Sequence, residues 1–479
     1  MDARQYDVIV IGAGPTGENV ADRAVKGGLS VAIIESELVG GECSYWACIP
    51  SKALLQPILA NAAARSVSGA LQDPGAKLDV AAVIARRDAF TAHWKDSGQV
   101  KWVEQSNIEL IRGHGRLAGE RKVRVTDKAG VVIDLIARHA VVICTGTRAA
   151  IPPIPGLAES RPWTSREATS AKKAPRRLVI LGGGVVACEM ATVWRHLGSD
   201  SITIIQRGPR LIENCEPFAG DMLRESFERS GVTVLTNTAI ECVERSADGS
   251  VQVSLSGGKT LLADEILVAA GREPRTHDLG LETVGLKLGS WLDVDDTMQV
   301  QGLAAGWLYA AGDVNHRVLL THMGKYQARA CGDVIAARAA RQIEAVAPKP
   351  WSRYTATADR QAVPQVIFTM PEVAMVGLSE AQARSRGMNI QVVDYDLGHV
   401  SGASLQADNY SGRARMIVDQ NRQVIVGLTL VGPGVGELIH AATIAVVGEV
   451  PIDRLWHAVP AFPTLSEIWL RLLETLRSK

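Results

Sequence analysis

Short apolar runs that end in glycine, each followed by a helix-like stretch, recur along the chain. The first run, Val8–Ile11, leads into Gly12, and the helix-like stretch Glu18–Lys26 precedes another run, Ser30–Ile34. Continuous apolar runs of this length, bounded by glycine, are typical of strands buried on both faces of a parallel sheet. The alternation of strand and helix therefore predicts an α/β fold.

The same alternation returns about 170 residues later, where Leu178–Leu181 leads into Gly182 and the run Ser201–Ile205 follows. A hairpin is predicted over Ala118–Gly130, with its turn at the glycine-containing end. Further expected strands are Val141–Thr147, Ile266–Pro274, Leu308–Val314, Ala414–Val418 and Val424–Leu430, and further expected helices are Ala53–Arg65, Ala81–Arg87 and Gly436–Val447.

Charge and overall hydropathy exclude two classes of partner. The 51 Lys and Arg residues balance the 51 Asp and Glu residues, and no basic run stands out, so nucleic acid is not expected as a partner. The chain starts with polar residues, and no apolar run approaches the roughly 18 residues of a membrane span. We therefore expect a cytoplasmic protein that does not enter a membrane.

The first glycine turn carries the pattern Gly-x-Gly-x-x-Gly at Gly12, Gly14 and Gly17. Between a strand and a helix, these glycines allow a tight turn and the close approach of a pyrophosphate to the helix N-terminus. Glu35 ends the next strand, where a carboxylate can bind the ribose hydroxyls of an adenosine. The combination predicts a dinucleotide site, and an ordinary glycine turn is the less favoured interpretation.

The second turn has Gly182 and Gly184, with Ala187 at the third glycine position. The next strand ends in Gln206 rather than an acid, and arginines follow it. Arg207 and Arg210 could bind a 2′-phosphate that a carboxylate would repel, which favours NADPH over NADH. The alternative is that both arginines are solvated loop charges. Two turns imply two dinucleotides, FAD on the first and the nicotinamide coenzyme on the second.

Cys43 and Cys48 lie just after the first turn, four residues apart. Such a pair could be a coincidence, half of a metal site or a structural pair, but beside a flavin it can store two electrons as a dithiol. No His cluster surrounds the pair, so a metal site is not expected. The other five cysteines are interpreted as small buried residues: Cys144, Cys188, Cys215, Cys242 and Cys331.

Taken in order, these motifs resemble the group I flavoprotein disulfide reductases, which include dihydrolipoamide dehydrogenase, glutathione reductase and mercuric reductase. The resemblance covers nearly the whole chain. Besides both turns, it rests on Cys43–Lys52, Thr145-Gly146, Glu189, Ala270–Pro274, Gly312-Asp313, Phe368–Ala374 and Pro463–Glu467.

The resemblance implies a role for individual residues. Cys43 would exchange with a disulfide substrate, Cys48 would form a thiolate–flavin charge-transfer complex, and Lys52 would pair with Glu189 where the nicotinamide docks. Asp313 would bind the ribityl side of the flavin. The expected cofactor contacts are Gly12, Gly14, Gly17, Glu35, Gly41, Lys52, Gly115, Thr145, Gly146, Gly312 and Asp313 for FAD, and Gly182, Gly184, Ala187, Gln206, Arg207, Arg210 and Gly271 for the coenzyme.

The resemblance also implies two Rossmann-like domains and a C-terminal α+β dimerisation domain. The expected division places FAD on residues 1–155 and 275–345, the coenzyme on 156–274, and the interface of a homodimer on 346–479. The proline-rich segments Ile151–Gly156 and Ala345–Trp351 lie at two of these boundaries. The C-terminal domain would complete the active site of the partner chain.

One position departs from the family pattern. Disulfide-reducing members have a His before Pro-Thr that pairs with the glutamate matching Glu467, whereas this chain has Phe462, which cannot carry a proton. Losing a positioned acid–base group typically costs about 10²–10⁴-fold in rate. His457 lies nearby in sequence, but we expect a structural role for it. Tyr45 and Trp46, between the cysteines, are interpreted as packing residues or as residues that narrow the substrate side.

The acceptor of the electrons stays open at this stage. The leading hypothesis is a disulfide-type acceptor with an atypical proton relay. A quinone or metal ion would need no His, and a reductive C–S cleaving enzyme, as in a relative with phenylalanine at the same position, is a further alternative. A mercuric reductase is disfavoured because the C-terminal cysteine pair of that enzyme is missing. A non-catalytic flavoprotein subunit is the weakest hypothesis.

Overall fold

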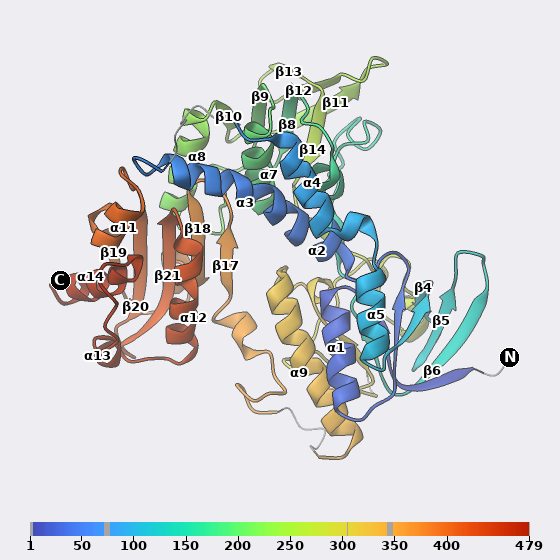
Figure 1. Cartoon of the computed structure of the whole chain (residues 1–479). Helices are drawn as coiled ribbons and strands as arrows, with labels where there is room; N and C mark the ends of the chain where they lie inside the picture. The colour runs from blue at the N-terminus through green and yellow to red at the C-terminus, as the bar shows by residue number, and fades with distance from the viewer. Residues whose placement is uncertain (1–2, 71–76, 304, 343–347, 479) are drawn as a thin grey trace. The chain divides into compact units, whose positions relative to one another are not determined.

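The computed structural model describes residues 3–70, 77–303, 305–342 and 348–478, which form two compact units (Figure 1). The first unit comprises residues 1–49, 88–148 and 272–360, and the second comprises residues 50–87, 149–271 and 361–479. Of the expected linker Ala345–Trp351, residues 345–347 lie outside the described part of the chain. Helices α3 (Cys48–Arg65) and α4 (Val80–Phe90) each contain residues of both units.

The first unit is built on one seven-stranded sheet with strand order β3-β2-β1-β6-β5-β4, and β16 also pairs with β6. Its strands are β1 (Arg4–Ile11), β2 (Val31–Glu35), β3 (Glu109–Arg112), β4 (His114–Leu117), β5 (Lys122–Thr126), β6 (Val132–Ile143) and β16 (Leu308–Ala310). β1 is parallel to both neighbours, with Val10 opposite Ile33 on one side and Val142 on the other. Its glycine-rich end therefore lies at the carboxyl edge of the sheet, where ligands bind in this architecture.

Alternate residues of β1 enter two different cores. Val8 and Val10 pack in one buried cluster, whereas Ile9 and Ile11 pack in another on the opposite face. The first face is covered by α1 (Pro15–Lys26) and α9 (Thr321–Ala339), which are joined by the ion pair Arg23–Asp333 at 2.7 Å. Burial on both faces is the physical reason for the uninterrupted apolar run in the sequence. Shorter helices of this unit are α2 (Gly41–Tyr45) and α5 (Ser97–Gln105).

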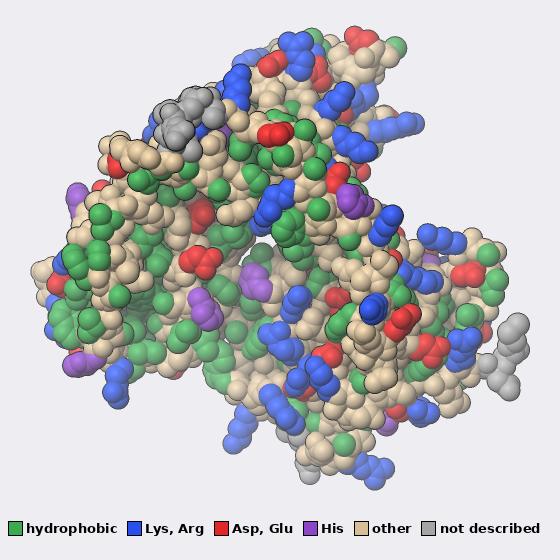
Figure 2. All heavy atoms as spheres, in the orientation of Figure 1, with side chains coloured by type: hydrophobic (Ala, Val, Ile, Leu, Met, Phe, Trp, Pro, Cys, Tyr) green, Lys and Arg blue, Asp and Glu red, His purple; other side chains and the backbone are tan. Residues whose placement is uncertain are grey.

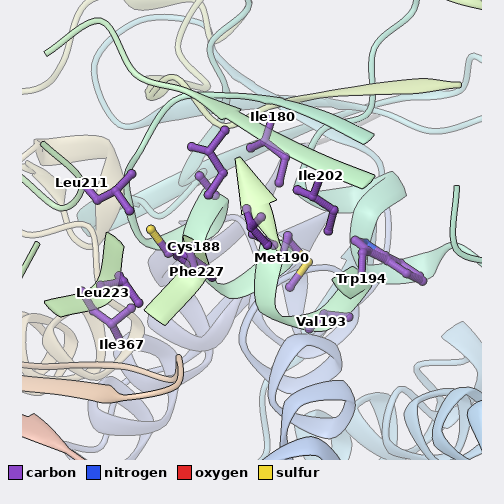
Figure 3. Close-up of a cluster of buried hydrophobic side chains, with 14 of the residues drawn as sticks. Ile180, Cys188, Met190, Val193, Trp194, Ile202, Leu211, Leu223, Phe227 and Ile367 are labelled. Atoms are coloured by element: carbon purple, nitrogen blue, oxygen red, sulfur yellow. The ribbon is translucent and has the colours of Figure 1, made fainter. Parts of the chain in front are cut away.

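The second unit contains a four-stranded parallel sheet of strand order β10-β9-β8-β14, together with a three-stranded antiparallel sheet. The strands are β8 (Arg177–Leu181), β9 (Ser201–Ile205), β10 (Val232–Leu235) and β14 (Glu265–Val268), then β11 (Ile240–Arg245), β12 (Val251–Leu255) and β13 (Thr260–Ala263). The helices are α6 (Ser165–Ser170), α7 (Val185–His196) and α8 (Pro217–Arg229). Figure 3 shows side chains of α7, including Met190 and Trp194, packed with Ile180 and Ile202 of the sheet.

The rest of the second unit is an antiparallel sheet of strand order β17-β18-β21-β20-β19 with helices around it. Its elements are β17 (Pro364–Ile367), β18 (Glu372–Gly377), α10 (Glu380–Ser385), β19 (Ile390–Asp396), α11 (Ser401–Gln406), β20 (Arg413–Asp419), β21 (Val424–Gly432), α12 (Ile439–Val447), α13 (Ile452–Leu455) and α14 (Ile468–Ser478). Every residue of β21 is buried, which explains its unbroken apolar sequence.

The expected elements are present, including the hairpin of β5 and β6, whose turn contains Gly130, but several differ in extent. The strands expected over Val141–Thr147 and Leu308–Val314 end at Ile143 and Ala310, and the one expected over Ile266–Pro274 is interrupted after Val268. The helix expected over Gly436–Val447 starts at Ile439, after a 3-10 turn. One expectation about the cysteines is wrong, because Cys242 is exposed while Cys144, Cys188, Cys215 and Cys331 are buried. A register shift in β11 between Ile240 and Cys242 is the cause: it leaves two successive residues facing outward.

The surface carries charges of both signs, and Figure 2 shows acidic and basic side chains interspersed over the face that it draws. Large exposed hydrophobic side chains are also present on the C-terminal part of the second unit, namely Leu405, Ile444, Val447, Val459 and Phe462. Among the described residues, none of the helices has both the length and the apolar character needed to cross a membrane.

Candidate active site

The two cysteines of the predicted redox pair lie together in the first unit. Cys43 is within α2 and Cys48 is the first residue of α3, and both are half-buried thiols. The Cys48 Sγ atom lies 3.2 Å from the hydroxyl oxygen of Thr321, the first residue of α9. The hydrogen bond between the two thiols raises the pKa of Cys43, and burial adds to this, while Thr321 and the charge of Lys325 oppose it.

The first glycine turn forms a cradle that only glycine can build. A Cβ at Gly12, whose φ is +103°, would lie 2.5 Å from the carbonyl oxygen of Cys144, and one at Gly17 would lie 1.9 Å from the Gly12 oxygen. Gly14 begins α1 without a side-chain cap, so the N–H groups of the first helical turn are left for a ligand. The Glu35 carboxylate accepts a hydrogen bond from the Ala13 N–H at 2.8 Å.

Burial raises the pKa of Glu35, although backbone N–H groups hydrogen-bonded to its carboxylate oppose this shift. Nearby in α1, burial raises the pKa of Glu18 to about 7, and the charge of Lys325 opposes this shift. Within the described part of the chain, one carboxylate oxygen of Glu18 is buried without a hydrogen-bond partner. Lys325 thus acts electrostatically on both Glu18 and the thiol of Cys43.

Asp313, which follows β16 and opens a 3-10 turn, belongs to a polar cluster that sequence reasoning did not find. Its carboxylate accepts a hydrogen bond from the Thr147 hydroxyl at 2.7 Å, and Arg272 donates to the same hydroxyl at 2.5 Å. Burial raises the pKa of Asp313, against the effects of Thr147 and Arg272. Arg272 and Arg275 also hold the carboxylate of Glu42, with nitrogen–oxygen distances of 3.4 and 3.2 Å.

The remaining residues predicted to bind FAD lie around the same sheet edge. Thr145 and Gly146 follow β6, and the Thr145 hydroxyl is buried with no hydrogen-bond partner among the described residues. Gly41 closely approaches Gly14, and Gly115, in β4, packs on Ile34. Gly312 directly precedes Asp313. A dinucleotide fits these features together: the glycine turn, the uncapped N-terminus of α1, the carboxylate of Glu35 and the unpartnered hydroxyl of Thr145.

The second turn repeats this construction in the second unit. A Cβ at Gly182 would lie 2.4 Å from the Ala269 oxygen, and Gly184 begins α7, again without a side-chain cap. Ala187 is fully buried, which fits its place at the third glycine position. Gln206 follows β9 as expected, and Gly271 follows the β14 strand. These residues fit a second dinucleotide.

The two arginines after β9 differ in their surroundings. Arg207 is exposed, whereas Arg210 is half-buried and its side-chain stem runs beside Gly220 of α8. Gln206 packs against Gly183 and donates a hydrogen bond to Glu213 at 3.0 Å. The carboxylate of Glu213 therefore stands on the same turn as the arginines.

Lys52 and Glu189 form the ion pair that the resemblance implied. The Lys52 Nζ atom lies 2.7 and 3.0 Å from the two carboxylate oxygens of Glu189, which is almost completely buried. Phe368 completes the group: its backbone N–H donates to Glu189 at 3.2 Å, and its ring centroid lies 4.9 Å from the Lys52 ammonium. This contact explains why an aromatic residue stands at that position.

Phe462 projects from the second unit with 75 % of its surface exposed. Glu467 is buried, and among the described residues one of its carboxylate oxygens has no hydrogen-bond partner, while the other lies 3.7 Å from Arg471. His457 is exposed just after α13. Within the described part of the chain, Glu467 therefore has no histidine partner.

The aromatic residues between the cysteines have different environments. Tyr45 is fully buried, and its hydroxyl donates a hydrogen bond to the Val39 carbonyl at 3.1 Å, so it packs as expected. Trp46 is half-buried, with its ring centroid 5.7 Å from that of Tyr45.

Sequence reasoning missed Thr321, Arg272, Arg275, Phe368 and Glu213 as contributors to these sites. Thr321 had one available signal, because it opens a helix that follows the Gly312-Asp313 turn. Arg272 and Phe368 lie within the motifs Ala270–Pro274 and Phe368–Ala374, but neither motif indicates their contacts with Thr147, Glu42 and Glu189. Arg275 and Glu213 have no such motif.

Comparison with known proteins gives consistent matches. Residues 6–328 match the family described as pyridine nucleotide-disulphide oxidoreductase, and residues 363–472 match its dimerisation domain. A dihydrolipoyl dehydrogenase of Thermus scotoductus is 32% identical over 483 residues, covering 99% of this chain and 98% of its own. A mercuric reductase of Staphylococcus aureus is 28% identical, covering 96% of this chain and 81% of its own.

Among solved structures, the HOCl-induced flavoprotein disulfide reductase RclA from Escherichia coli, in its Cu(II) complex, matches with a TM-score of 0.83. Its sequence is 24% identical, and the match covers 99% of each chain. At this identity the likeness shows the fold.

The chain belongs to the pyridine nucleotide-disulphide oxidoreductase family. It is an NAD(P)H-dependent flavoprotein oxidoreductase, and the cofactors of its family are FAD and NAD(P)H. The two dinucleotide folds and the C-terminal dimerisation domain are the architecture predicted from the sequence.

Proposed function

We propose that the protein uses NAD(P)H to reduce a disulfide-type acceptor through Cys43 and Cys48. The observation that carries this proposal is the hydrogen-bonded thiol pair, with Cys48 held by Thr321 in the same unit as the first glycine turn. Neither a structural disulfide nor a scaffold requires two half-buried thiols beside a dinucleotide site. The pair therefore serves as the exchangeable two-electron store.

Gly12, Gly14, Gly17, Glu35 and Asp313 would hold FAD, which when bound would supply a two-electron carrier between the nicotinamide and the sulfurs. The second turn, in residues 156–274, binds the nicotinamide coenzyme. Lys52 and Glu189 form a fixed charge pair, with Phe368 holding both partners in place. We assign FAD to residues 1–155 and 275–345.

The dithiol performs the exchange in two balanced steps. A thiolate of Cys43 attacks one sulfur of the substrate disulfide, forms a mixed disulfide and releases the first thiol. Cys48 then attacks Cys43, which forms the Cys43–Cys48 disulfide and releases the second thiol. Overall, two electrons and two protons reach the substrate. The Thr321 hydroxyl stabilises the thiolate form of Cys48 by donating a hydrogen bond to it.

The proton supply is the atypical part of this reaction. Phe462 carries no proton, so residues 346–479, which we propose form the homodimer interface, contribute an apolar ring rather than an acid–base group. Protons for the leaving thiols then come from water or from the substrate itself.

A second candidate function is the reduction of a quinone or a metal ion. Phe462 favours it, because such an acceptor needs no thiol protonation by a His. The relative named mercuric reductase is consistent with a metal-ion acceptor.

Anaerobic titration of the FAD-loaded protein with NADPH, and separately with NADH, tests the proposal. Uptake of two hydride equivalents, the first with little flavin bleaching, is expected because the sulfurs accept the first pair of electrons. The variant Cys48→Ser should take up one equivalent and bleach at once. Uptake of one equivalent by the unchanged protein would contradict the dithiol role and would favour direct flavin acceptors.

A further inference from the structure

Gln206 holds the position in the second unit that Glu35 holds in the first. The Gly12 N–H donates to the Ile34 carbonyl at 2.9 Å, and the Gly182 N–H donates to the Ile205 carbonyl at 2.8 Å. Residues 35 and 206 each follow that matched strand residue, so they are structural equivalents. Glu35 places a carboxylate there, whereas Gln206 places an amide.

A carboxylate nevertheless reaches this turn from further along the chain. The Gln206 Nε2 atom donates to the Oε1 atom of Glu213 at 3.0 Å. A Cβ added to Gly208 would lie 1.5 Å from that same oxygen, so the carboxylate packs directly on the Gly208 backbone. Gly208 does not have a positive φ, so its backbone conformation does not require glycine. Glycine is required because a side chain would collide with the Glu213 carboxylate.

The turn that carries Glu213 is fixed against the dinucleotide-binding loop. The Ile212 N–H donates to the Gly183 carbonyl at 2.8 Å, and the Asn237 N–H donates to the Gly208 carbonyl at 2.9 Å. The Gln206 side chain packs on Gly183, where a Cβ would lie 3.1 Å from its Cγ atom. Glu213 is thus held at the end of β9, where the adenosine of a dinucleotide lies in this architecture.

We propose that Glu213 is a specificity-determining residue for the nicotinamide coenzyme, supplying the ribose-side carboxylate that the end of β9 lacks. Its Oε2 atom, which Gln206 leaves available, accepts a hydrogen bond from the 2′-hydroxyl of NADH. The same charge repels the 2′-phosphate of NADPH, which Arg207 attracts from the same turn. Glu213 and Arg207 therefore act in opposite directions, and their balance sets the preference between the two coenzymes.

This inference rests on the proposed function only in assigning the coenzyme to the second turn. The test measures binding rather than turnover, so its result does not depend on the identity of the electron acceptor. The probes are adenosine 5′-monophosphate and adenosine 2′,5′-bisphosphate, which carry no nicotinamide. Their dissociation constants are measured by calorimetry on the FAD-loaded protein.

The variant Glu213→Gln keeps the shape of the side chain and an oxygen for Gln206, but removes the charge. We expect it to bind the bisphosphate about tenfold more tightly relative to the monophosphate, which corresponds to about 1.4 kcal/mol. Gly208→Ala should shift the ratio in the same direction, because its Cβ displaces the carboxylate. Glu225→Gln, in the exposed pair with Arg229 on α8, is the matched control and should leave the ratio unchanged.

The assignment to Glu213 would be overturned if Glu213→Gln and Gly208→Ala changed the dissociation constants of both probes equally, or changed neither. Failure of the unchanged protein to bind either probe is a different result. It would remove the coenzyme from the second turn and overturn that part of the proposed function together with the inference.

Discussion

The ammonium group of Lys52 lies 2.7 Å from one carboxylate oxygen of Glu189 and 3.0 Å from the other. The Glu189 side chain is only 5 % exposed, and the Lys52 side chain is 36 % exposed. A carboxylate this deeply buried depends on its counter-charge and its hydrogen bonds. The backbone N–H of Phe368 supplies one further hydrogen bond.

Lys52→Met should therefore destabilise the protein by about 3 kcal/mol, because it leaves the buried Glu189 charge without its cation. Urea unfolding of the FAD-loaded protein measures the effect. The double variant Lys52→Met/Glu189→Leu should recover most of the loss, since no charge then remains buried. Lys26→Met removes an exposed helical pair with Asp22 and should change the free energy of unfolding by less than about 0.5 kcal/mol. Equal losses in both Lys variants would contradict the argument.

Thr321→Val should raise the pKa of the Cys48 thiol, because the thiolate loses a hydrogen-bond donor. The thiolate absorbance near 240 nm, followed as a function of pH in a Cys43→Ser background, measures the shift. Thr321→Ser keeps the hydroxyl and should leave the pKa of the thiol as it is with Thr321 in place. If Val and Ser behave alike, the 3.2 Å contact does not act on the thiol.

Phe462→His should raise the rate of disulfide reduction by about 10²-fold or more, because it introduces a group able to carry a proton. Phe462 is 75 % exposed, so the substitution should leave the free energy of unfolding within about 0.5 kcal/mol. Steady-state turnover of an aromatic disulfide gives the rate, and Phe462→Leu is the control without a proton carrier. An unchanged rate in the His variant would show that Phe462 does not determine the acceptor.

The double variant Arg207→Ala/Arg210→Ala should selectively raise the dissociation constant for NADPH by about tenfold, if the two arginines bind the 2′-phosphate. NADH lacks that phosphate, so its constant should stay near the original value. Because Arg210 runs beside α8, Arg207→Ala alone should produce most of the effect. An equal loss for both coenzymes would mean that the arginines are ordinary loop charges.

Asp359 should make the stability depend on pH. Burial raises the pKa of Asp359 from 3.8 to about 6, although Arg317 and Gln327 oppose this and Asp296 adds to it. Between about pH 4 and 6 the folded protein then binds more protons than the unfolded chain, so the free energy of unfolding falls as the pH rises. The fall has an upper limit of about 3 kcal/mol.

Asp359→Asn should flatten this slope, which urea unfolding at several pH values measures. Asp453→Asn, at a side chain that is 99 % exposed, is the control and should keep the slope of the unchanged protein. A slope that persists in Asp359→Asn would assign the pH dependence to another group.

The sequence by itself determined the two dinucleotide folds and the placement of their turns. Gly12 and Gly182 could be recognised because a buried strand, a tight turn and a helix N-terminus are local features, encoded in neighbouring residues. The cysteine pair was likewise visible from its position after the first turn. The family assignment followed from the order of such motifs along the chain.

Only the tertiary structure decided which distant side chains meet. Thr321 reaches Cys48 because α9 starts beside α3, and Arg272 and Arg275 reach Glu42 from more than 200 residues away. The second turn shows the limit most clearly: the sequence predicts no acid at the end of β9, yet the fold of the following loop returns Glu213 to that place. Cys242 is exposed because of a register shift that no local pattern announced. The spacing of neighbouring residues determines strands, helices and turns. Contacts between residues far apart in the sequence depend on how the packed elements place their ends next to one another.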